Sequence, residues 1–206
     1  MLAPVATPLP AFSALLFGLS GCLVDFGAQA GAASKGPAPA LDTHAQLTPG
    51  ALENLQSLRQ QGIPCAWLDE LPDPLSQALS APLGNLITAT ARSQVRWPAP
   101  DACWLALMAL KVNQLAGCVL VSGEPRLLRS GLNAGLWTIG LASCGSLCGL
   151  SPTQWQALES IERERLRAQA TLQLYALGTH SVIDHLGEPE SCLADISLRR
   201  SKGEKP

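Results

Sequence analysis

Charged residues are scarce in this sequence of 206 residues. Asp, Glu, Lys and Arg make up 15% of the chain, and the formal net charge is −2. Without a basic surplus the chain has no electrostatic attraction for nucleic acid or for an anionic membrane, so we expect neither as a partner. Hydrophobic residues make up 47%. That is enough for one sizeable core, and we expect a single domain over residues 1–206.

Positive charge is absent from the first ten residues, MLAPVATPLP. A secretory leader needs a positively charged start, so we expect a cytoplasmic protein. The lesser alternative is a lipoprotein, because residues 19–22, Leu-Ser-Gly-Cys, have the form of a lipoprotein cleavage site. Seven cysteines, an odd and scattered set, indicate buried thiols rather than disulfides. Cys144 and Cys148 lack the second pair or nearby histidine of a zinc site.

The most regular stretch is residues 118–150, CVLVSGEPRLLRSGLNAGLWTIGLASCGSLCGL. An apolar run ends at a polar turn, apolar residues then recur at helical spacing, and Gly135 ends the predicted helix before a second apolar run at 136–142. Neither run alternates with polar residues, as expected of parallel strands that are covered on both faces. The stretch therefore predicts a strand, a crossover helix and a parallel strand.

The rest of the chain alternates in the same way. Apolar runs predict strands within 12–24 and at 63–68, 86–91 and 181–183. Helical spacing predicts helices at 48–62, 75–83, 104–115 and 191–197, and one long helix from Ser151-Pro152 to Gly178. We expect an α/β fold: a Rossmann-like parallel sheet with helices on both faces and a ligand crevice at the carboxyl ends of the strands. Residues 198–206 are expected to form a charged, solvated tail.

Residues 121–142 and 149–196 resemble the C-terminal half of phosphonoacetaldehyde hydrolase, a member of the haloacid dehalogenase (HAD) superfamily. Weaker matches lie at 18–27, where Gly-Leu-Ser-Gly-Cys-Leu-Val-Asp-Phe-Gly is similar to the family's first motif, and at 47–63 and 98–100. The resemblance implies a HAD core. It also implies hydrolysis of phosphonoacetaldehyde with magnesium, through a phosphorylated aspartate and a lysine Schiff base.

The positions that carry this chemistry in the family are changed here. Gly18 stands where the resemblance places the nucleophile, and Ser20 where a small residue offers its carbonyl to magnesium. The phosphate-binding hydroxyl is replaced around Trp67 and Leu68. Further on, the phosphate-binding arginine is replaced by Trp97, and the acidic pair that includes a magnesium ligand by Ser122 and Gly123. We therefore expect no retained catalytic residue, no magnesium and no other cofactor.

The helical cap of the family is expected to be largely deleted. Residues 28–47, rich in Ala, Gly and Pro, stand at its place and predict a linker. Lys35 lies within it, and a lysine in a loop keeps a pKa of about 10.4 and is a poor amine nucleophile. His180 and His185, near the last strand, are expected to be ordinary edge or loop histidines.

Three functional hypotheses follow. The first is a non-catalytic homologue that binds or regulates a protein partner or a second copy, through an exposed patch of Trp67, Leu68 and Trp97. The second is a repurposed hydrolase, in which a cation is bound by a shifted acidic set near the crevice mouth: Asp25, Asp69, Glu70 and Glu124. The third is residual phosphonoacetaldehyde hydrolysis, for which Arg96 would have to replace the lost arginine.

Overall fold

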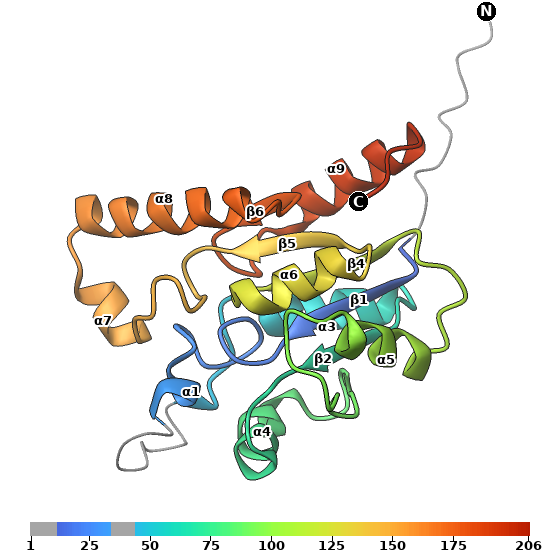
Figure 1. Cartoon of the computed structure of the whole chain (residues 1–206). Helices are drawn as coiled ribbons and strands as arrows, with labels where there is room; N and C mark the ends of the chain where they lie inside the picture. Colours follow the sequence, from blue (N-terminus) through green and yellow to red (C-terminus); the bar gives the residue numbers. More distant parts are fainter. Residues whose placement is uncertain (1–11, 34–43) are drawn as a thin grey trace, which may run out of the picture.

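The computed structural model describes residues 12–33 and 44–206. Within them, six parallel strands form one sheet in the order β3-β2-β1-β4-β5-β6 (Figure 1). The strands are β1 (Ala14–Gly18), β2 (Cys65–Leu68), β3 (Thr88–Ala89), β4 (Cys118–Ser122), β5 (Trp137–Leu141) and β6 (Ser181–Ile183). Central β1 pairs with β2 on one side and with β4 on the other. The predicted parallel α/β sheet is confirmed.

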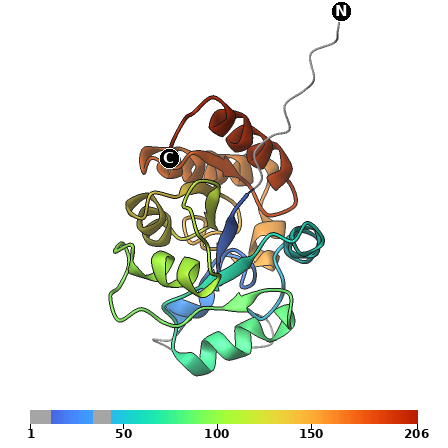
Figure 2. The same ribbon diagram turned by 90° about the vertical axis from the view of Figure 1, so that its right-hand side faces the viewer.

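Helices cover both faces of this sheet (Figures 1 and 2). They are α1 (Gln29–Ala33), α3 (Ala51–Gln60), α4 (Asp73–Ser80), the 3₁₀ turn η1 (Ala81–Leu83), α5 (Asp101–Ala109), α6 (Pro125–Asn133), α7 (Pro152–Ala157), α8 (Ser160–Ala176) and α9 (Pro189–Ser201). Successive side chains of β1 point to opposite faces of the sheet. Leu15 and Phe17 join the apolar cluster that includes α3 and α9, whereas Leu16 joins the cluster that includes α5 and α6.

The predicted strand, helix and strand of residues 118–142 are all present. β4 and β5 are fully buried and pair in parallel, and α6 ends just before Gly135, whose φ of 75° is easily adopted only by glycine. α6 lies close against the sheet. A Cβ built on Gly131 would be 2.5 Å from the side chain of Leu120. These are the apolar contacts that the helical spacing predicted.

The single long helix predicted after Ser151-Pro152 is wrong. Two helices stand there, because Leu158 and Glu159 adopt extended backbone with ψ of 147° and 152° between α7 and α8. The break rotates the second helix relative to the first, so apolar residues before and after it do not share a face. Ala170 and Leu174 are buried as expected, but Ile161 is 80% exposed.

Two further helices differ from the prediction. α5 ends at Ala109 rather than at 115, and it buries Cys103 and Leu107 while Met108 is 65% exposed. Its residues are apolar all round, so the periodicity could not identify the buried face. α3 begins after Gly50 instead of after Thr48. The Thr48 hydroxyl donates a hydrogen bond to the carbonyl oxygen of Cys22, so it does not cap the helix.

The segments predicted as linker and tail are also more ordered than expected. The start of the linker forms α1, and Ala30 is buried in the core. At the other end, α9 continues to Ser201, so the first part of the expected solvated tail is helical. The guanidinium of Arg199 lies over the ring of Trp137, 4.7 Å from its centroid, and that of Arg200 lies 5.6 Å from the Phe12 ring. Lys35 falls outside the described residues.

Candidate functional site

A crevice of about 350 Å³ opens at the carboxyl ends of β1, β2 and β4, beside the point where the strand order reverses. Open parallel sheets bind ligands at such a switch point. We call this hollow the β1–β4 crevice. It brings together nine of the residues singled out from the sequence: Gly18, Ser20, Leu68, Asp69, Glu70, Arg96, Trp97, Ser122 and Glu124.

Gly18, the last residue of β1, is closely packed against β4. A Cβ built on it would lie 2.7 Å from the hydroxyl oxygen of Ser122. Ser122 is fully buried, and its hydroxyl accepts a hydrogen bond from the N–H of Glu124 at 3.0 Å. A larger residue at position 18 would therefore require the Ser122 side chain to move.

Gly123 is packed against backbone rather than against side chains. A Cβ built on it would lie 2.4 Å from both the Cα of Gly145 and the carbonyl oxygen of Gly21. The N–H of Ser146 donates to the carbonyl oxygen of Gly123 at 3.1 Å and holds the loop after β5 in place. Backbone atoms cannot rotate away as the end of a side chain can, so this arrangement accepts only glycine at position 123.

Two carboxylates of the crevice are already engaged. Glu70 accepts hydrogen bonds from the N–H of Trp97 at 2.5 Å and from Nη1 of Arg126 at 3.3 Å. Glu124 is the N-cap of α6 and accepts from the N–H of Arg126 at 3.1 Å. Arg126 also donates to the carbonyl oxygen of Trp97. The sequence reasoning overlooked Arg126, although its place in the first turn of a helix that starts at the crevice was a usable signal.

Asp69 is the third carboxylate of the crevice, and only 7% of its side chain is exposed. Its Oδ1 lies 3.6 Å from Nη2 of Arg92, whereas its buried Oδ2 has no hydrogen-bond partner among the described residues. Burial raises the pKa of Asp69 above its usual value, against the opposing effects of Ser76 and Arg92. The ionised form of this side chain is thus poorly accommodated.

The predicted exposed patch of Trp67, Leu68 and Trp97 is wrong. Trp97 is 9% exposed and Leu68 is 4% exposed, and both belong to the apolar cluster that includes α5. Trp67 is half-buried and packs against the opposite cluster. The reason is that Leu68 and Trp97 pack between the sheet and the helices on that face, and only a small part of each side chain borders the crevice. The neighbouring Arg96 is exposed at the rim.

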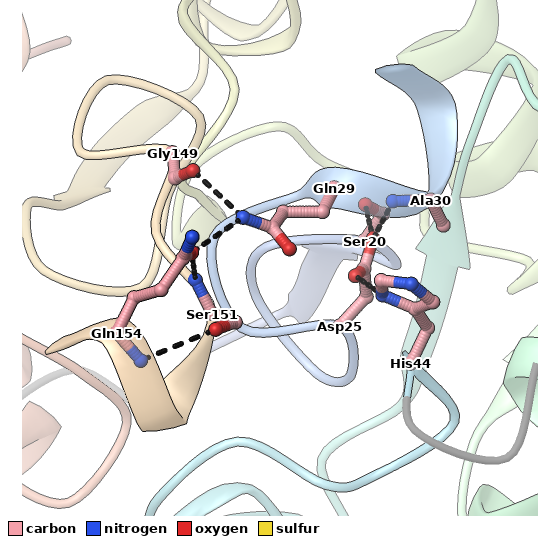
Figure 3. Close-up of polar contacts among 8 residues, drawn as sticks. All are labelled: Ser20, Asp25, Gln29, Ala30, His44, Gly149, Ser151 and Gln154. Atoms are coloured by element: carbon pink, nitrogen blue, oxygen red, sulfur yellow. Dashed lines mark hydrogen bonds and ion pairs between the residues drawn. The ribbon is translucent and has the colours of Figure 1, made fainter. Parts of the chain in front are cut away.

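Asp25 does not line the β1–β4 crevice, contrary to its place in the predicted cation set. Its side chain has no exposed surface, and three groups donate to its carboxylate (Figure 3). These are the hydroxyl of Ser20 at 2.6 Å, the N–H of Ala30 at 3.0 Å and Nδ1 of His44 at 2.8 Å. Asp25 adopts a φ of 57°, and this turns the chain from β1 toward α1. Its role in the fold is to fix that turn.

A second, larger hollow lies beside the crevice, at the carboxyl ends of β5 and β6. Its volume is about 720 Å³, and we call it the Arg163 pocket. Residues from the loop after β1, the loops after β5 and β6, and α7 and α8 line it, among them Asp25, Phe26, His44, Ser143, Trp155, Arg163, Arg167, Asp184 and His185. The sequence reasoning missed it, because these residues are far apart in the chain and form no motif.

A hydrogen-bond network fixes one wall of the Arg163 pocket (Figure 3). The amide nitrogen of Gln29, in α1, donates to the carbonyl oxygen of Gly149 at 3.0 Å and to Oε1 of Gln154 at 3.1 Å. Oε1 of Gln154 also accepts from the N–H of Ser151, whose hydroxyl in turn accepts from the N–H of Gln154. This capping box starts α7 and ties it to α1.

His180 contributes to packing and lies outside both hollows. Its Nδ1 accepts a hydrogen bond from the N–H of Thr138 at 3.1 Å, and its ring lies 4.7 Å from that of Trp137. Burial and the nearby charge of Arg199 lower the pKa of His180. Cys144 and Cys148 are free thiols. Among residues 12–33 and 44–206, no group of three or more His, Cys, Asp or Glu side chains is arranged to hold a metal ion.

Two phosphonoacetaldehyde hydrolases are similar to this chain in sequence. A phosphonoacetaldehyde hydrolase from Klebsiella pneumoniae is 30% identical over 168 residues, which are 76% of this chain and 61% of that protein. The phosphonoacetaldehyde hydrolase of Bordetella pertussis is 31% identical over 170 residues, 79% of this chain and 61% of that protein. The chain thus spans 61% of the length of these curated relatives. No protein-family model matches it.

Solved structures agree with the fold. One chain that is 70% identical superposes with a TM-score of 0.90 over 95% of this chain and 100% of its own length. A phosphonoacetaldehyde hydrolase-like protein from Oleispira antarctica, 23% identical, gives 0.87 over 100% of both chains. A HAD family hydrolase from Deinococcus radiodurans, with bound phosphate and sodium, is 20% identical and gives 0.59 over 91% and 97%.

The six-stranded parallel sheet, with helices on both faces and a crevice at its carboxyl edge, is that of a HAD-type α/β domain. The sequence similarity to phosphonoacetaldehyde hydrolases and this fold together support a phosphonoacetaldehyde hydrolase-like member of the HAD superfamily. None of the described helices has both the length and the apolar character needed to cross a membrane.

Proposed function

We propose that this protein is a non-hydrolysing member of its family that acts by binding. The observation that carries the proposal is the packing of Gly123. The resemblance assigns this position to a magnesium ligand, yet the backbones of Gly21 and Gly145 occupy the space of a Cβ there, at 2.4 Å. A carboxylate cannot enter unless the loop after β5 is rebuilt.

The other groups around the β1–β4 crevice do not fit magnesium either. The ion requires hard oxygen ligands in near-octahedral geometry. Position 18 offers no side chain, and Glu70 and Glu124 are engaged by Trp97 and Arg126. Asp69 has a raised pKa, which opposes the ionised form that a cation needs. These features favour the binding hypothesis over a shifted cation site or residual hydrolysis.

Loss of the nucleophile alone can reduce turnover by about a millionfold in enzymes whose catalytic residues act as a unit. In the proposed protein, that loss is accompanied by the loss of the metal and phosphate contacts. The protein is cytoplasmic and binds a protein partner or a second copy of itself, and it binds neither nucleic acid nor membrane. The low net charge of −2 supports the last point.

The test is an activity assay on the purified chain with phosphonoacetaldehyde and with an aryl phosphate, each with magnesium and with EDTA. We expect no turnover above the blank and no change of melting temperature with magnesium, because only a bound ion stabilises the folded state by mass action. Turnover that EDTA abolishes would overturn the proposal.

A double variant extends this test. Gly18→Asp with Ser122→Gly restores a carboxylate at the end of β1 and removes the hydroxyl that a Cβ at position 18 would meet. We expect it to fold and to stay inactive, because position 123 still offers no ligand. Hydrolysis by this variant would show that the packing at Gly123 is not what prevents the reaction.

A further inference from the structure

The Arg163 pocket has the dimensions of a ligand site, although no motif marks it. Its volume of about 720 Å³ lies within the range of small-molecule pockets, roughly 300–1,000 Å³. It lies at the same edge of the sheet as the β1–β4 crevice, but it opens over β5 and β6. Four parts of the chain that are distant in sequence converge on it.

Arg163 brings a guanidinium without a partner among the described residues to this pocket. Within the part of the chain that the structure describes, its guanidinium makes no hydrogen bond and no ion pair, and its Nε is buried without a partner. Buried polar atoms are normally paired, and an unpaired one costs free energy. A guanidinium presents a planar set of donors that matches carboxylate and phosphate oxygens. Arg163 is therefore suited to an anionic ligand.

The three acidic residues that line the pocket interact with groups other than Arg163. The carboxylate of Asp25 accepts from Ser20, Ala30 and His44. Glu164 and Asp184 both pair with Arg167, the latter at 3.5 Å. Arg167 is thus shared by two carboxylates, whereas no described carboxylate pairs with Arg163.

Aromatic side chains form an apolar wall of the pocket. The rings of Phe26 and Trp155 have centroids 6.2 Å apart and are inclined at 52°. Phe26 follows Asp25, whose carboxylate is fixed by three donors, and Trp155 lies on α7, which is tied to Gln29. Both rings are therefore held in place before any ligand arrives, and this lowers the entropic cost of binding.

We propose that the Arg163 pocket binds a small organic anion that carries a flat apolar or aromatic body. Its carboxylate or phosphoryl oxygens pair with Arg163, and its apolar part packs against Trp155 and Phe26. The inference goes beyond the proposed function, because it concerns a different hollow and holds whether or not the β1–β4 crevice hydrolyses anything.

Calorimetry with four probes tests the proposal. Phenylacetate and phenyl phosphate combine a ring with an anion, inorganic phosphate has no ring, and benzylamine has a ring with the opposite charge. We expect the first two to bind and the last two to bind at least about tenfold more weakly, as for loss of one charge-assisted contact. The stronger of the first two identifies the anionic group. Equal binding of benzylamine would overturn the charge assignment.

Variants locate the site. Arg163→Gln should raise the Kd of the preferred probe by about 10- to 100-fold. Arg165→Gln is the matched control: it removes the same charge from the same helix, but Arg165 pairs with Glu162 at 2.6 Å and does not line the pocket. It should change the Kd by less than about twofold. Equal effects of the two variants, or no binding by either ring-bearing anion, would overturn the proposal.

Two further measurements cover the case in which Arg163→Gln fails to fold. Arg163→Lys keeps the positive charge but loses the planar set of donors. The variant should bind the preferred probe more weakly than the parent protein does, but still more tightly than the variant binds benzylamine. In NMR spectra, the preferred probe should shift the indole N–H signal of Trp155, which is assigned by its absence in Trp155→Phe. A bound probe that leaves this signal in place would show that the site lies elsewhere.

Discussion

The β1–β4 crevice and the Arg163 pocket lie side by side at one edge of the same sheet, yet they are built in opposite ways. Beside the crevice, backbone atoms occupy the space around Gly123, and the indole of Trp97 is packed into the crevice wall. The side chains of Arg126 and Glu70 form an ion pair there. In the Arg163 pocket the volume is about twice as large, and the buried atom without a partner among the described residues is a cationic nitrogen, Nε of Arg163, whereas in the crevice such atoms are Oδ2 of Asp69 and Nε1 of Trp97.

Under the two proposals above, this chain binds its ligand at a neighbouring position along the same edge of the sheet. The β1–β4 crevice lies where the strand order reverses, and Leu68 and Trp97 beside it are part of the core. The loop after β5 also packs against Gly123, but together with the loop after β6 and with α8 it borders the Arg163 pocket, where charged side chains gather. Fold and family therefore do not locate the site by themselves.

The largest effect is expected from Gly123→Ala. If the crevice is filled by backbone, the new Cβ must displace Gly145 or Gly21, and the free energy of unfolding should fall by about 5 kcal/mol. Gly31→Ala is the control: it lines the same crevice, and its Cβ would be 3.4 Å from the Leu71 side chain, an ordinary contact. Urea unfolding followed by circular dichroism measures both. A stable Gly123→Ala protein would mean that the crevice has room for a ligand.

A smaller effect is expected from Trp97→Ala. Trp97 is 9% exposed and belongs to the core, so truncation should cost about 3 kcal/mol through lost burial and an unfilled cavity. Trp155→Ala removes a half-buried indole from the Arg163 pocket, and it should cost about 1 kcal/mol or less. Thermal unfolding compares the two variants. Similar losses would remove the contrast between a filled crevice and an open pocket.

The smallest effect concerns pH. The folded protein raises the pKa of Asp69 above its usual 3.8, so ionisation of this group opposes folding. Asp69→Asn should therefore gain stability relative to the parent as the pH rises from below 3.8 toward 7. Glu164, beside the pocket, has its pKa lowered by its hydrogen bond to Arg167, so its ionised form favours folding. Glu164→Gln should show the opposite trend.

Melting temperatures of both variants and the parent between pH 3 and pH 7 measure these trends. The control is their behaviour toward the acid end, where both carboxyl groups take up protons and the two differences from the parent should shrink. If the two differences from the parent ran in parallel with pH, the environments of the two carboxylates would not differ as described.

The sequence predicted the sheet because buried parallel strands and a crossover helix leave a clear periodic pattern, as in residues 118–142. It placed nine of the singled-out residues in one crevice, because strands of a parallel sheet end at one edge. It misjudged Trp97 because alignment gives a position but not the direction of a side chain. It missed the pocket because Arg163 is a candidate binding residue only through its lack of a partner among the described residues, and such pairing is determined by the folded chain.

α9 covers part of the sheet that is translated long before it. Arg200 of α9 lies over Phe12, just before β1, and Arg199 lies over Trp137 of β5. β1 is translated before α9, which packs together with α3 against the same side of the sheet. The cover of Leu15 and Phe17 on that side is therefore completed only after residue 200 has left the exit tunnel, and until then chaperones can reach part of this face.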